Sequence, residues 1–470
     1  MQLTESQREV YRRYAELALP RHTSYPAVPF WGPYDEDSFR AAIERANRRG
    51  DDLSLYVHVP FCERLCYYCT CTKQILPRRE DGRWVEASSG YLERLGREIA
   101  RVASSVAPRR MVRQIHLGGG TPTYLTPRQL TELFAILHRQ FDIAADAEMS
   151  IELDPRVTSL DQLHTLGELG FNRVSLGVQD FDPHVQAAVN RVQPLELVAK
   201  LVGNCRNLGF RSINFDLIYG LPFQTVASVA ATIRKTIALG ADRVAFYRMA
   251  VIPELFRWQN VFRPDDLPGT DATCDMMLVA IESFESAGYR FVGLDHFAKP
   301  DEHLARAGES GSLRRTFQGM TTGGGLDVIG FGPSAISILG DAYAQNSKSV
   351  EDWSAAIDAG RLATSRGLDL SREDQLRAAV IEQLYCYAEI DKNAIERRFE
   401  ISFDEQFADE LVRLDSLQDE GLVELMEHRV RVTYPLGRLL LRVVTAVFDA
   451  YLPPDALRHG QSPLLASKVG

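Results

Sequence analysis

The sequence has little cysteine and no long apolar run. Only seven of its 470 residues are cysteine, and nothing suggests the disulfide framework that small secreted domains use. No stretch reaches the roughly 20 apolar residues of a membrane-spanning helix. The amino-terminal segment, residues 1–20, has mixed charges and no apolar core before a cleavage site, so it does not read as a secretory signal. We therefore expect a cytoplasmic protein with reduced thiols and no membrane partner.

An excess of positive charge is also missing. The formal net charge is −10, and an acidic chain is a poor general binder of nucleic acid because phosphate groups need a basic face. Hydrophobic residues make up 45% of the chain, which is enough to bury a large core. The length exceeds one ordinary domain. We expect a monomer with one large domain and a smaller one attached.

Four of the seven cysteines lie within ten residues: Cys62, Cys66, Cys69 and Cys71. Clustered soft thiolates select zinc or iron–sulfur. Structural zinc prefers two cysteine pairs separated by a longer loop, whereas an iron–sulfur cluster takes its thiolates from one short run. The spacing C-x3-C-x2-C favours a cluster that is held by three cysteines and leaves one iron open. Zinc and inert thiols are the weaker alternatives.

Short apolar strands alternate with helices through the first two thirds of the chain. We predict strands at 53–59, 113–120, 149–155, 173–179, 213–220 and 243–251, and helices at 90–106, 127–141, 160–170, 195–209 and 228–240. Such a βα repeat requires parallel strands with right-handed crossovers. The fold class is therefore α/β, and six units fit an open (β/α)6 barrel.

The pattern changes after about residue 360. Helices are predicted at 371–390, 403–422 and 438–452, with a hairpin at 422–437, which suggests a small winged-helix-like domain. We divide the chain into an N-terminal helical extension (1–50), a barrel (51–360) and a C-terminal domain (361–470) that covers the active-site mouth or docks substrate.

Glycines and polar residues follow successive predicted strands. A glycine run ends the second strand, and Glu152, Gln179 and Asp216 lie at or near the ends of the next three. Ligand sites in parallel sheets lie at the carboxyl ends of strands, so these residues should meet at one site beside the cysteines. Arg191 could add a positive charge that binds a carboxylate.

The cysteine stretch resembles the radical SAM superfamily, whose signature is C-x3-C-x2-C and whose core is the open (β/α)6 barrel. The resemblance implies that Cys62, Cys66 and Cys69 hold a [4Fe-4S] cluster, with Cys71 nearby as a non-ligand. The open iron would bind S-adenosylmethionine (SAM), and one electron would cleave it to a 5′-deoxyadenosyl radical. Tyr68 would pack on the adenine. A reductant such as flavodoxin or ferredoxin would supply the electron.

Longer stretches, among them PRHTSYP, LGGGTPTYL, GFNRVSLGVQDF and NFDLIYGLP, resemble the oxygen-independent coproporphyrinogen III oxidase family along almost the whole chain. That resemblance implies two SAM molecules. The one on the cluster would contact Tyr56, Gly119, Glu152 and Ile336. The second would contact Tyr68, Gly120, Thr121, Gln179, Arg191, Asp216 and Ala250.

Some positions depart from the family pattern. Met249, Val251 and Met320 stand where the family has Tyr, His and Tyr. Losing these polar groups would remove hydrogen-bond partners of a tetra-anionic porphyrinogen. We therefore expect a family member with another small-molecule substrate. Its second SAM would give a methylene group to an sp2 carbon, by C-methylation or cyclopropanation, and a partner methyltransferase could finish the product.

Two alternatives remain open. One is the activity of the family itself, the oxidative decarboxylation of coproporphyrinogen III to protoporphyrinogen IX. The other is a haem-binding chaperone, which the intact cysteine loop disfavours because relatives of that kind tend to lack the cluster cysteines.

Overall fold

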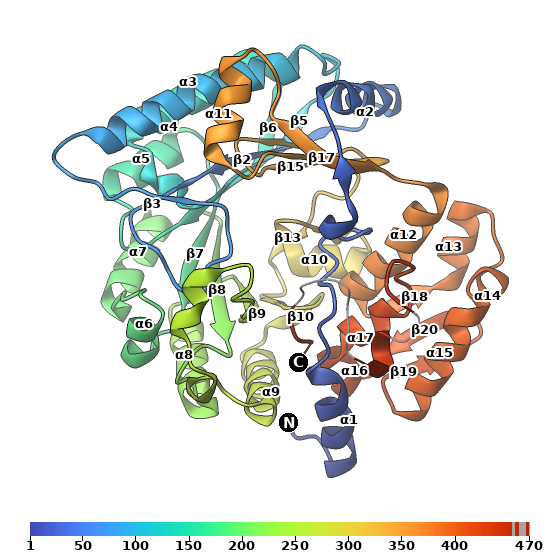
Figure 1. Ribbon diagram of the computed structural model, residues 1–470. Helices are drawn as coiled ribbons and strands as arrows, with labels where there is room; N and C mark the ends of the chain where they lie inside the picture. Colours follow the sequence, from blue (N-terminus) through green and yellow to red (C-terminus); the bar gives the residue numbers. More distant parts are fainter. Residues whose placement is uncertain (454–455, 460–466, 470) are drawn as a thin grey trace.

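A curved sheet of 13 strands dominates the computed structural model, which describes residues 1–453, 456–459 and 467–469 (Figure 1). Seven adjacent strands of this sheet run parallel. In spatial order they are β14 (Asp327–Phe331), β2 (Leu53–Val59), β5 (Val112–Gly119), β6 (Ile143–Leu153), β7 (Arg173–Gln179), β8 (Ser212–Tyr219) and β9 (Arg243–Arg248). Their carboxyl ends therefore meet on one side of the molecule.

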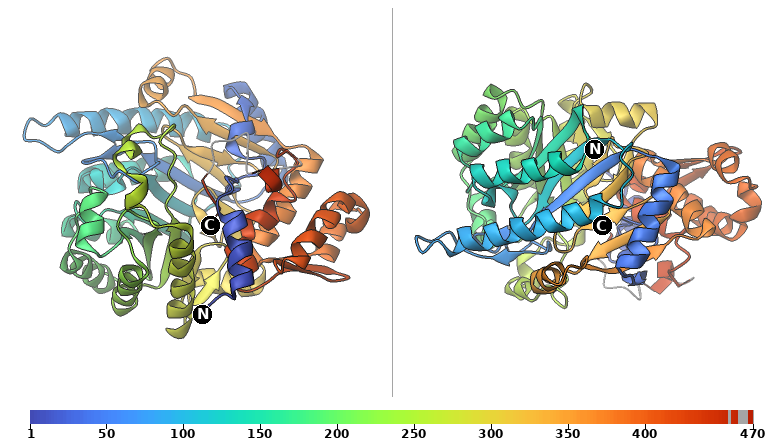
Figure 2. Two further views of the ribbon diagram at one scale, coloured as in Figure 1. Left: turned by 60° about the horizontal axis from the view of Figure 1, so that its bottom comes forward. Right: turned by 90° about the horizontal axis from the view of Figure 1, so that it is seen from above.

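Helices connect these strands and cover the outer face of the sheet (Figures 1 and 2). Buried Leu92, Leu95 and Ile99 recur at three- and four-residue spacing along one of them and so form an apolar face toward the core. Thr126 begins another with a capping box that includes Gln129, worth about 0.5–2 kcal/mol. The helices are α3 (Arg83–Ala103), α4 (Pro127–Gln140), α5 (Leu160–Glu168), α6 (Pro183–Ala188), α7 (Leu195–Asn207), α8 (Val226–Ala238) and α9 (Thr270–Ser286).

The α/β class and the partial barrel are confirmed, and all six predicted strands are present. Two of them, 53–59 and 173–179, coincide with β2 and β7. The prediction did not include β14, which adds to the sheet beside β2. A helix–Gly–strand pattern at 287–297 indicates the edge strand β10 (Arg290–Val292). The prediction missed the other antiparallel edge strands, which are β1 (Gly32–Pro33), β11 (His296–Ala298), β15 (Ile336–Ile338), β16 (Ala342–Asn346) and β17 (Thr364–Asp369). Several are only two or three residues long, too short for a periodic pattern to mark.

A buried ion pair joins β14 to the segment that leads into β5. The guanidinium of Arg110 contacts the carboxylate of Asp327, and the two side chains are 0% and 3% exposed. Arg110 also donates to the carbonyl of Asp51 at 2.6 Å. The pair lies at the amino-terminal ends of the strands, opposite the predicted site, so its role is structural.

Replacing Arg110 by Met should lower the free energy of unfolding by about 3–5 kcal/mol, because the carboxylate of Asp327 then stays buried without its main partner. Chemical denaturation followed by circular dichroism measures this change. Arg113→Met is the matched control: its partner Asp52 is 2.8 Å away, but Arg113 is 43% exposed, so the loss should be below about 1 kcal/mol. Equal losses in both variants would contradict the expectation, and Arg110→Met/Asp327→Leu should recover most of the stability.

The C-terminal part forms a second hydrophobic core beside the barrel (Figure 2). Its sheet, in the order β18 (Glu389–Asp391), β20 (Arg429–Val432), β19 (Val423–Leu425), packs with helices. These helices are α12 (Arg372–Tyr387), α13 (Lys392–Phe399), α14 (Phe403–Gln406), α15 (Ala408–Asp419), α16 (Leu436–Leu439), α17 (Leu441–Ala446) and α18 (Ala456–His459). The predicted hairpin is present as β19 and β20, and the predicted helix at 371–390 is α12. The predicted helix at 403–422 is divided into α14 and α15, the one at 438–452 is reduced to the end of α16 and the short α17, and α13 was not predicted.

The N-terminal segment contributes to both cores. Helix α1 (Glu5–Ala15) buries Tyr11 and Tyr14 in the second core, whereas α2 (Glu36–Arg49) buries Phe39 and Ile43 in the barrel core. The proposed boundaries at 50/51 and 360/361 stay predictions. Remaining elements are α10 (His303–Ser310), α11 (Val350–Asp358), the hairpin of β12 (Arg314–Thr316) and β13 (Gly319–Thr321), and the pair β3 (Phe61–Cys62) and β4 (Gln74–Ile75). No helix within the described ranges is long and apolar enough to cross a membrane.

Candidate active site

A cavity of about 420 Å³ opens at the carboxyl ends of the parallel strands. The cysteine loop after β2 forms one wall, and the ends of β5, β6, β7 and β8 form the others. Most predicted site residues line it, although they come from distant parts of the chain. They are Cys62, Cys66, Tyr68, Cys69, Gly119, Gly120, Thr121, Glu152, Gln179, Arg191 and Asp216.

Side chains that donate hydrogen bonds to its backbone carbonyls hold the cysteine loop over the strand ends. The side chain of Asn190 donates to the carbonyl of Leu65 at 2.7 Å. On the other side of the loop, the indole of Trp258 and the ammonium of Lys73 each donate to the carbonyl of Cys69 at 3.1 Å. Lys73 also lies over the Trp258 ring, 4.2 Å from its centroid. The loop conformation is thus fixed by neighbours from two other segments.

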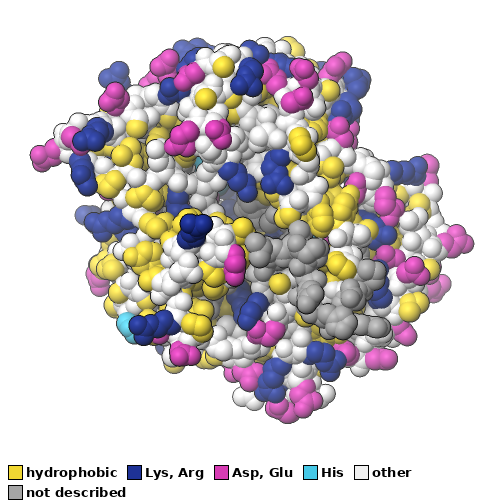
Figure 3. Space-filling view, in the orientation of Figure 1, with side chains coloured by type: hydrophobic (Ala, Val, Ile, Leu, Met, Phe, Trp, Pro, Cys, Tyr) yellow, Lys and Arg dark blue, Asp and Glu magenta, His cyan; other side chains and the backbone are white. Residues whose placement is uncertain are grey.

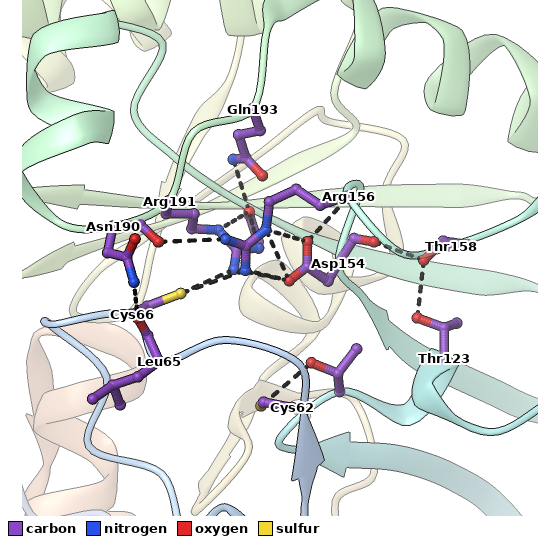
Figure 4. A network of polar contacts seen from close by, with 12 residues as sticks. Cys62, Leu65, Cys66, Thr123, Asp154, Arg156, Thr158, Asn190, Arg191 and Gln193 are labelled. Carbon is purple, nitrogen blue, oxygen red and sulfur yellow. Dashed lines mark hydrogen bonds and ion pairs between the residues drawn. The ribbon is translucent and has the colours of Figure 1, made fainter. Parts of the chain in front are cut away.

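Two arginines approach the thiol of Cys66 (Figure 4). The nearest guanidinium nitrogens of Arg156 and Arg191 are both 3.5 Å from its sulfur. Asp154 lies between them and accepts from Arg156 at 2.6 Å and from Arg191 at 3.2 Å. Burial alone would raise the pKa of Asp154, but the two arginines lower it well below its usual value. The network places positive charge beside a sulfur that must ionise to bind metal.

The thiols differ in how readily they ionise. A hydrogen bond from Cys71 and the positive charge of Lys73 lower the pKa of Cys69 to about 6, although burial opposes this shift. Burial raises the pKa of Cys62 to about 12, although the hydroxyl of Thr121, 3.5 Å from its sulfur, opposes the shift. A bound metal deprotonates coordinating thiols outright, so the second value does not prevent ligation.

The donor set fits an iron–sulfur cluster better than a single metal ion. Three thiols share one cavity wall, and within the described part of the chain no three His, Cys, Asp or Glu side chains are placed to hold a single ion. A structural zinc ion takes four such ligands around one point, whereas thiolates of a multi-iron cluster bind separate irons. Cys71 also lines the cavity and hydrogen-bonds to Cys69, so its role as a non-ligand stays a prediction.

Polar groups at the strand ends face the same space. Glu152 accepts from the backbone N–H of Gly119 at 3.0 Å. Asp216 accepts from Ser175 at 2.9 Å, and its pKa is raised by burial and by the charge of Glu152. Arg191 donates to the carbonyl of Gly177 at 2.6 Å. These groups are held in place by the protein and can orient a charged, polar ligand such as SAM.

Three predicted contacts do not line this cavity. The hydroxyl of Tyr56 forms a hydrogen bond with Nδ1 of His58, with 3.0 Å between the two atoms. The carbonyl of Ala250 accepts from Gln259 at 2.9 Å, and Ile336 pairs with Gln345 in the sheet. Their contacts with SAM stay predictions, as do those of the lining residues.

The sequence prediction missed Asp154 and Arg156. Both follow directly after β6, in the stretch IELDPR that supplied Glu152. Charged residues immediately beyond a strand end are the signal that could have found them, but only the structure shows that both side chains turn toward Cys66 (Figure 4).

Comparison with known proteins identifies the relatives of this chain. The radical SAM superfamily model matches residues 56–236, and the HemN C-terminal domain model matches residues 370–440. The oxygen-independent coproporphyrinogen III oxidase of Pseudomonas aeruginosa is 45% identical over 451 residues, which cover 95% of this chain and 96% of that protein. The chain belongs to the oxygen-independent coproporphyrinogen III oxidase family.

Other members of this family agree with that assignment. The Escherichia coli oxidase is 43% identical over 93% of this chain and 94% of its own. The solved structure of E. coli coproporphyrinogen III oxidase, described as a radical SAM enzyme, matches with a TM-score of 0.86 at 40% identity and covers 93% of this chain and 100% of that one. Membership in the superfamily implies a [4Fe-4S] cluster and SAM as cofactors.

The predicted diversion to methylene or methyl transfer is wrong. The chain is 40–45% identical to coproporphyrinogen III oxidases over nearly its full length, which overturns this prediction. The structure also shows why two of the departures from the family pattern do not indicate another substrate. Met249 is 7% exposed and packs with Val185 and Leu221 in a small apolar cluster. Met320 is 5% exposed and belongs to the second core. These positions are packing positions, so an apolar residue there does not report on the substrate.

Proposed function

We propose that this protein is an oxygen-independent coproporphyrinogen III oxidase that converts coproporphyrinogen III to protoporphyrinogen IX. The observation that carries the proposal is its 45% identity, over 95% of its length, to the P. aeruginosa protein of that name. The cavity supports it, because three thiols and the polar strand ends share one space. Identity of the whole chain matters here, since the superfamily fold alone hosts many reactions.

Cys62, Cys66 and Cys69 would hold the cluster, which when bound supplies the electron that cleaves SAM. Glu152 and the glycine turn at Gly119 and Gly120 would bind the polar end of SAM, since carbonyl and carboxylate oxygens accept from an ammonium group. The cysteine loop and its neighbours would exclude water from the reactive carbon, because they cover the strand ends.

At the substrate, each of two propionate side chains would lose one hydrogen atom, one electron and carbon dioxide, and so become a vinyl group. SAM, when cleaved, would supply the 5′-deoxyadenosyl radical that takes up this hydrogen atom as 5′-deoxyadenosine. The leftover electron requires an electron acceptor, and a one-electron reductant of the flavodoxin or ferredoxin class serves the cleavage of SAM. Two SAM molecules would match two such events, and Gln179, Arg191 and Asp216, which line the cavity, would contact the second.

Anaerobic incubation of the reconstituted enzyme with SAM, reductant and coproporphyrinogen III tests the proposal. We expect carbon dioxide and 5′-deoxyadenosine, and protoporphyrinogen IX by mass spectrometry. With deuteromethyl-labelled SAM the product should carry no label. Tight haem binding without cleavage of SAM would instead favour a haem-binding chaperone, and failure to release carbon dioxide from this substrate would refute the oxidase assignment.

A further inference from the structure

A second group of charged residues lies between the barrel and the C-terminal helices. Arg21 follows α1, Arg248 ends β9, and Arg315 is the middle residue of β12. We call these three residues the basic trio. Arg21 and Arg248 line a narrow cavity of about 40 Å³ together with Asp295, and a guanidinium nitrogen of Arg315 lies 3.8 Å from the carboxylate of Asp295.

The trio has hydrogen-bond donors that the protein does not use. The side chain of Arg315 is only 6% exposed. Its Nε and Nη1 find no hydrogen-bond acceptor among the described residues, and the same holds for Nε of Arg21 and Nη1 of Arg248. Burial of such donors without partners is costly, more so when they are charged. The trio is therefore suited to an acceptor that comes from outside the chain.

Positive charge exceeds negative charge at this place. Asp295 is the one acidic side chain among the described residues that line the narrow cavity, while Arg438 and Arg442 line it as well. Arg442 donates to backbone carbonyls, among them those of Leu19 and Ser467. It forms no ion pair with a carboxylate among the described residues, so its positive charge also remains unbalanced. Burial would raise the pKa of Asp295, yet Arg315, His296 and Arg21 lower it to about 2. Within this narrow cavity the one carboxylate does not balance Arg21, Arg248, Arg438 and Arg442, and a further anion would.

The trio adjoins the space of the predicted reaction. Tyr247, next to Arg248 on β9, lies with its ring edge toward His296, 5.9 Å between centroids. Arg248 pairs with Tyr219 at the carboxyl end of β8, the strand that carries Asp216, so Arg248 lies at the same edge of the sheet as the cavity that Asp216 lines. Figure 3 shows Lys and Arg side chains around a central hollow on this face of the molecule.

We propose that Arg21, Arg248 and Arg315 form a binding site for a propionate carboxylate of the tetrapyrrole substrate. This inference rests on the proposed function and names the residues that recognise the substrate. A carboxylate has two oxygens that accept the paired donors of a guanidinium, and such charge-assisted pairs are stronger than neutral ones. The planar arginine fork suits this task better than the single ammonium group of lysine.

Binding of coproporphyrin III, the stable oxidised form, to the reconstituted enzyme with SAM tests the site by fluorescence titration. Arg248→Gln and Arg315→Gln should each weaken binding roughly tenfold to a hundredfold, and Arg315→Lys should fall between wild type and Arg315→Gln. The tetra-amide of coproporphyrin, which keeps the ring but has no carboxylates, should bind all forms equally. Arg206→Gln is the control, because Arg206 pairs with Asp242 at 2.6 Å, away from the trio.

Kinetics and cofactor content separate this inference from the proposed function. For coproporphyrinogen III the trio variants should raise KM with little change in kcat, and iron content should match wild type. Wild-type affinity in both Gln variants, or equal loss of affinity for the acid and the tetra-amide, would overturn the carboxylate site. Absence of decarboxylation by the wild-type enzyme would instead refute the function, whatever the variants bind.

Discussion

Replacement of Cys62, Cys66 or Cys69 by Ala should abolish iron and sulfide binding and reduce formation of 5′-deoxyadenosine by about a thousandfold or more. The reason is that each thiolate holds a separate iron, and two cannot keep the third iron in place. Iron and sulfide analysis after anaerobic reconstitution, with electron paramagnetic resonance of the reduced protein, measures the first effect. Chromatography of the cleaved cofactor measures the second.

Two other cysteines serve as controls for this experiment. Cys71 lies outside the C-x3-C-x2-C spacing, and Cys205 is buried on α7 in the barrel core. Cys71→Ala and Cys205→Ala should retain iron close to the wild-type amount. If Cys71→Ala lost iron as completely as Cys66→Ala, the three-cysteine assignment would be wrong, and a site with no iron open for SAM would have to be considered.

Substitution of Gly120 by Ala should disrupt the same site through the backbone. A Cβ atom on Gly120 would lie 2.7 Å from the carbonyl oxygen of Phe61 and 3.1 Å from the sulfur of Cys62. Backbone atoms cannot yield as a flexible side chain does, so the cysteine loop would have to move away from the strand end. We expect a loss of cofactor cleavage of about a hundredfold or more, since small misplacements at a reacting site have effects of this size.

Gly167→Ala is the matched control for the glycine experiment. Gly167 lies within α5, and a Cβ atom placed there meets nothing within 4 Å. Alanine is the better helix former by about 1 kcal/mol, so this variant should be fully active and slightly more stable. Iron content and the rate of 5′-deoxyadenosine formation should be compared for both variants. Equal activity of Gly120→Ala and wild type would show that the close approach of the loop is not required.

Local patterns in the sequence were sufficient for most of the barrel. β2 is an almost continuously buried run that ends before Pro60, and β7 is an alternating run that ends at Gln179, so the signals lie in the strand itself and its immediate neighbours. The edge strands are different. Residues 336–338 and 296–298 become strands because a neighbouring strand offers them hydrogen bonds, and pairing between distant segments leaves no local pattern.

In the candidate site, too, some features are indicated by the local sequence and others are shown only by the folded structure. The cysteine spacing is local, and so is the placement of Glu152 and Asp216 at strand ends, which parallel topology then brings together. The approach of Arg156 and Arg191 to Cys66 depends on two side-chain orientations. No pattern in the sequence indicates that these two guanidinium groups approach the sulfur.

Side-chain burial explains two of the three departures behind the error about the substrate, whereas the third, Val251, is 39% exposed. In the sequence, Met249 and Met320 read as lost polar contacts of a substrate, because a departure from a family pattern carries no information about which way a residue faces. In the folded protein both are packed in apolar clusters. The basic trio shows the converse, since Arg21, Arg248 and Arg315 have no common motif and meet only when α1, β9 and the β12–β13 hairpin pack together.

The sequence by itself determined the parallel α/β barrel, the thiol loop and the order of polar residues along its strand ends, because periodicity and spacing are properties of neighbouring residues. Tertiary structure alone decided which strands close the sheet edges, which methionines are packing residues and which arginines gather around Asp295. Those features depend on contacts between segments tens to hundreds of residues apart, and such contacts exist only after the chain has folded.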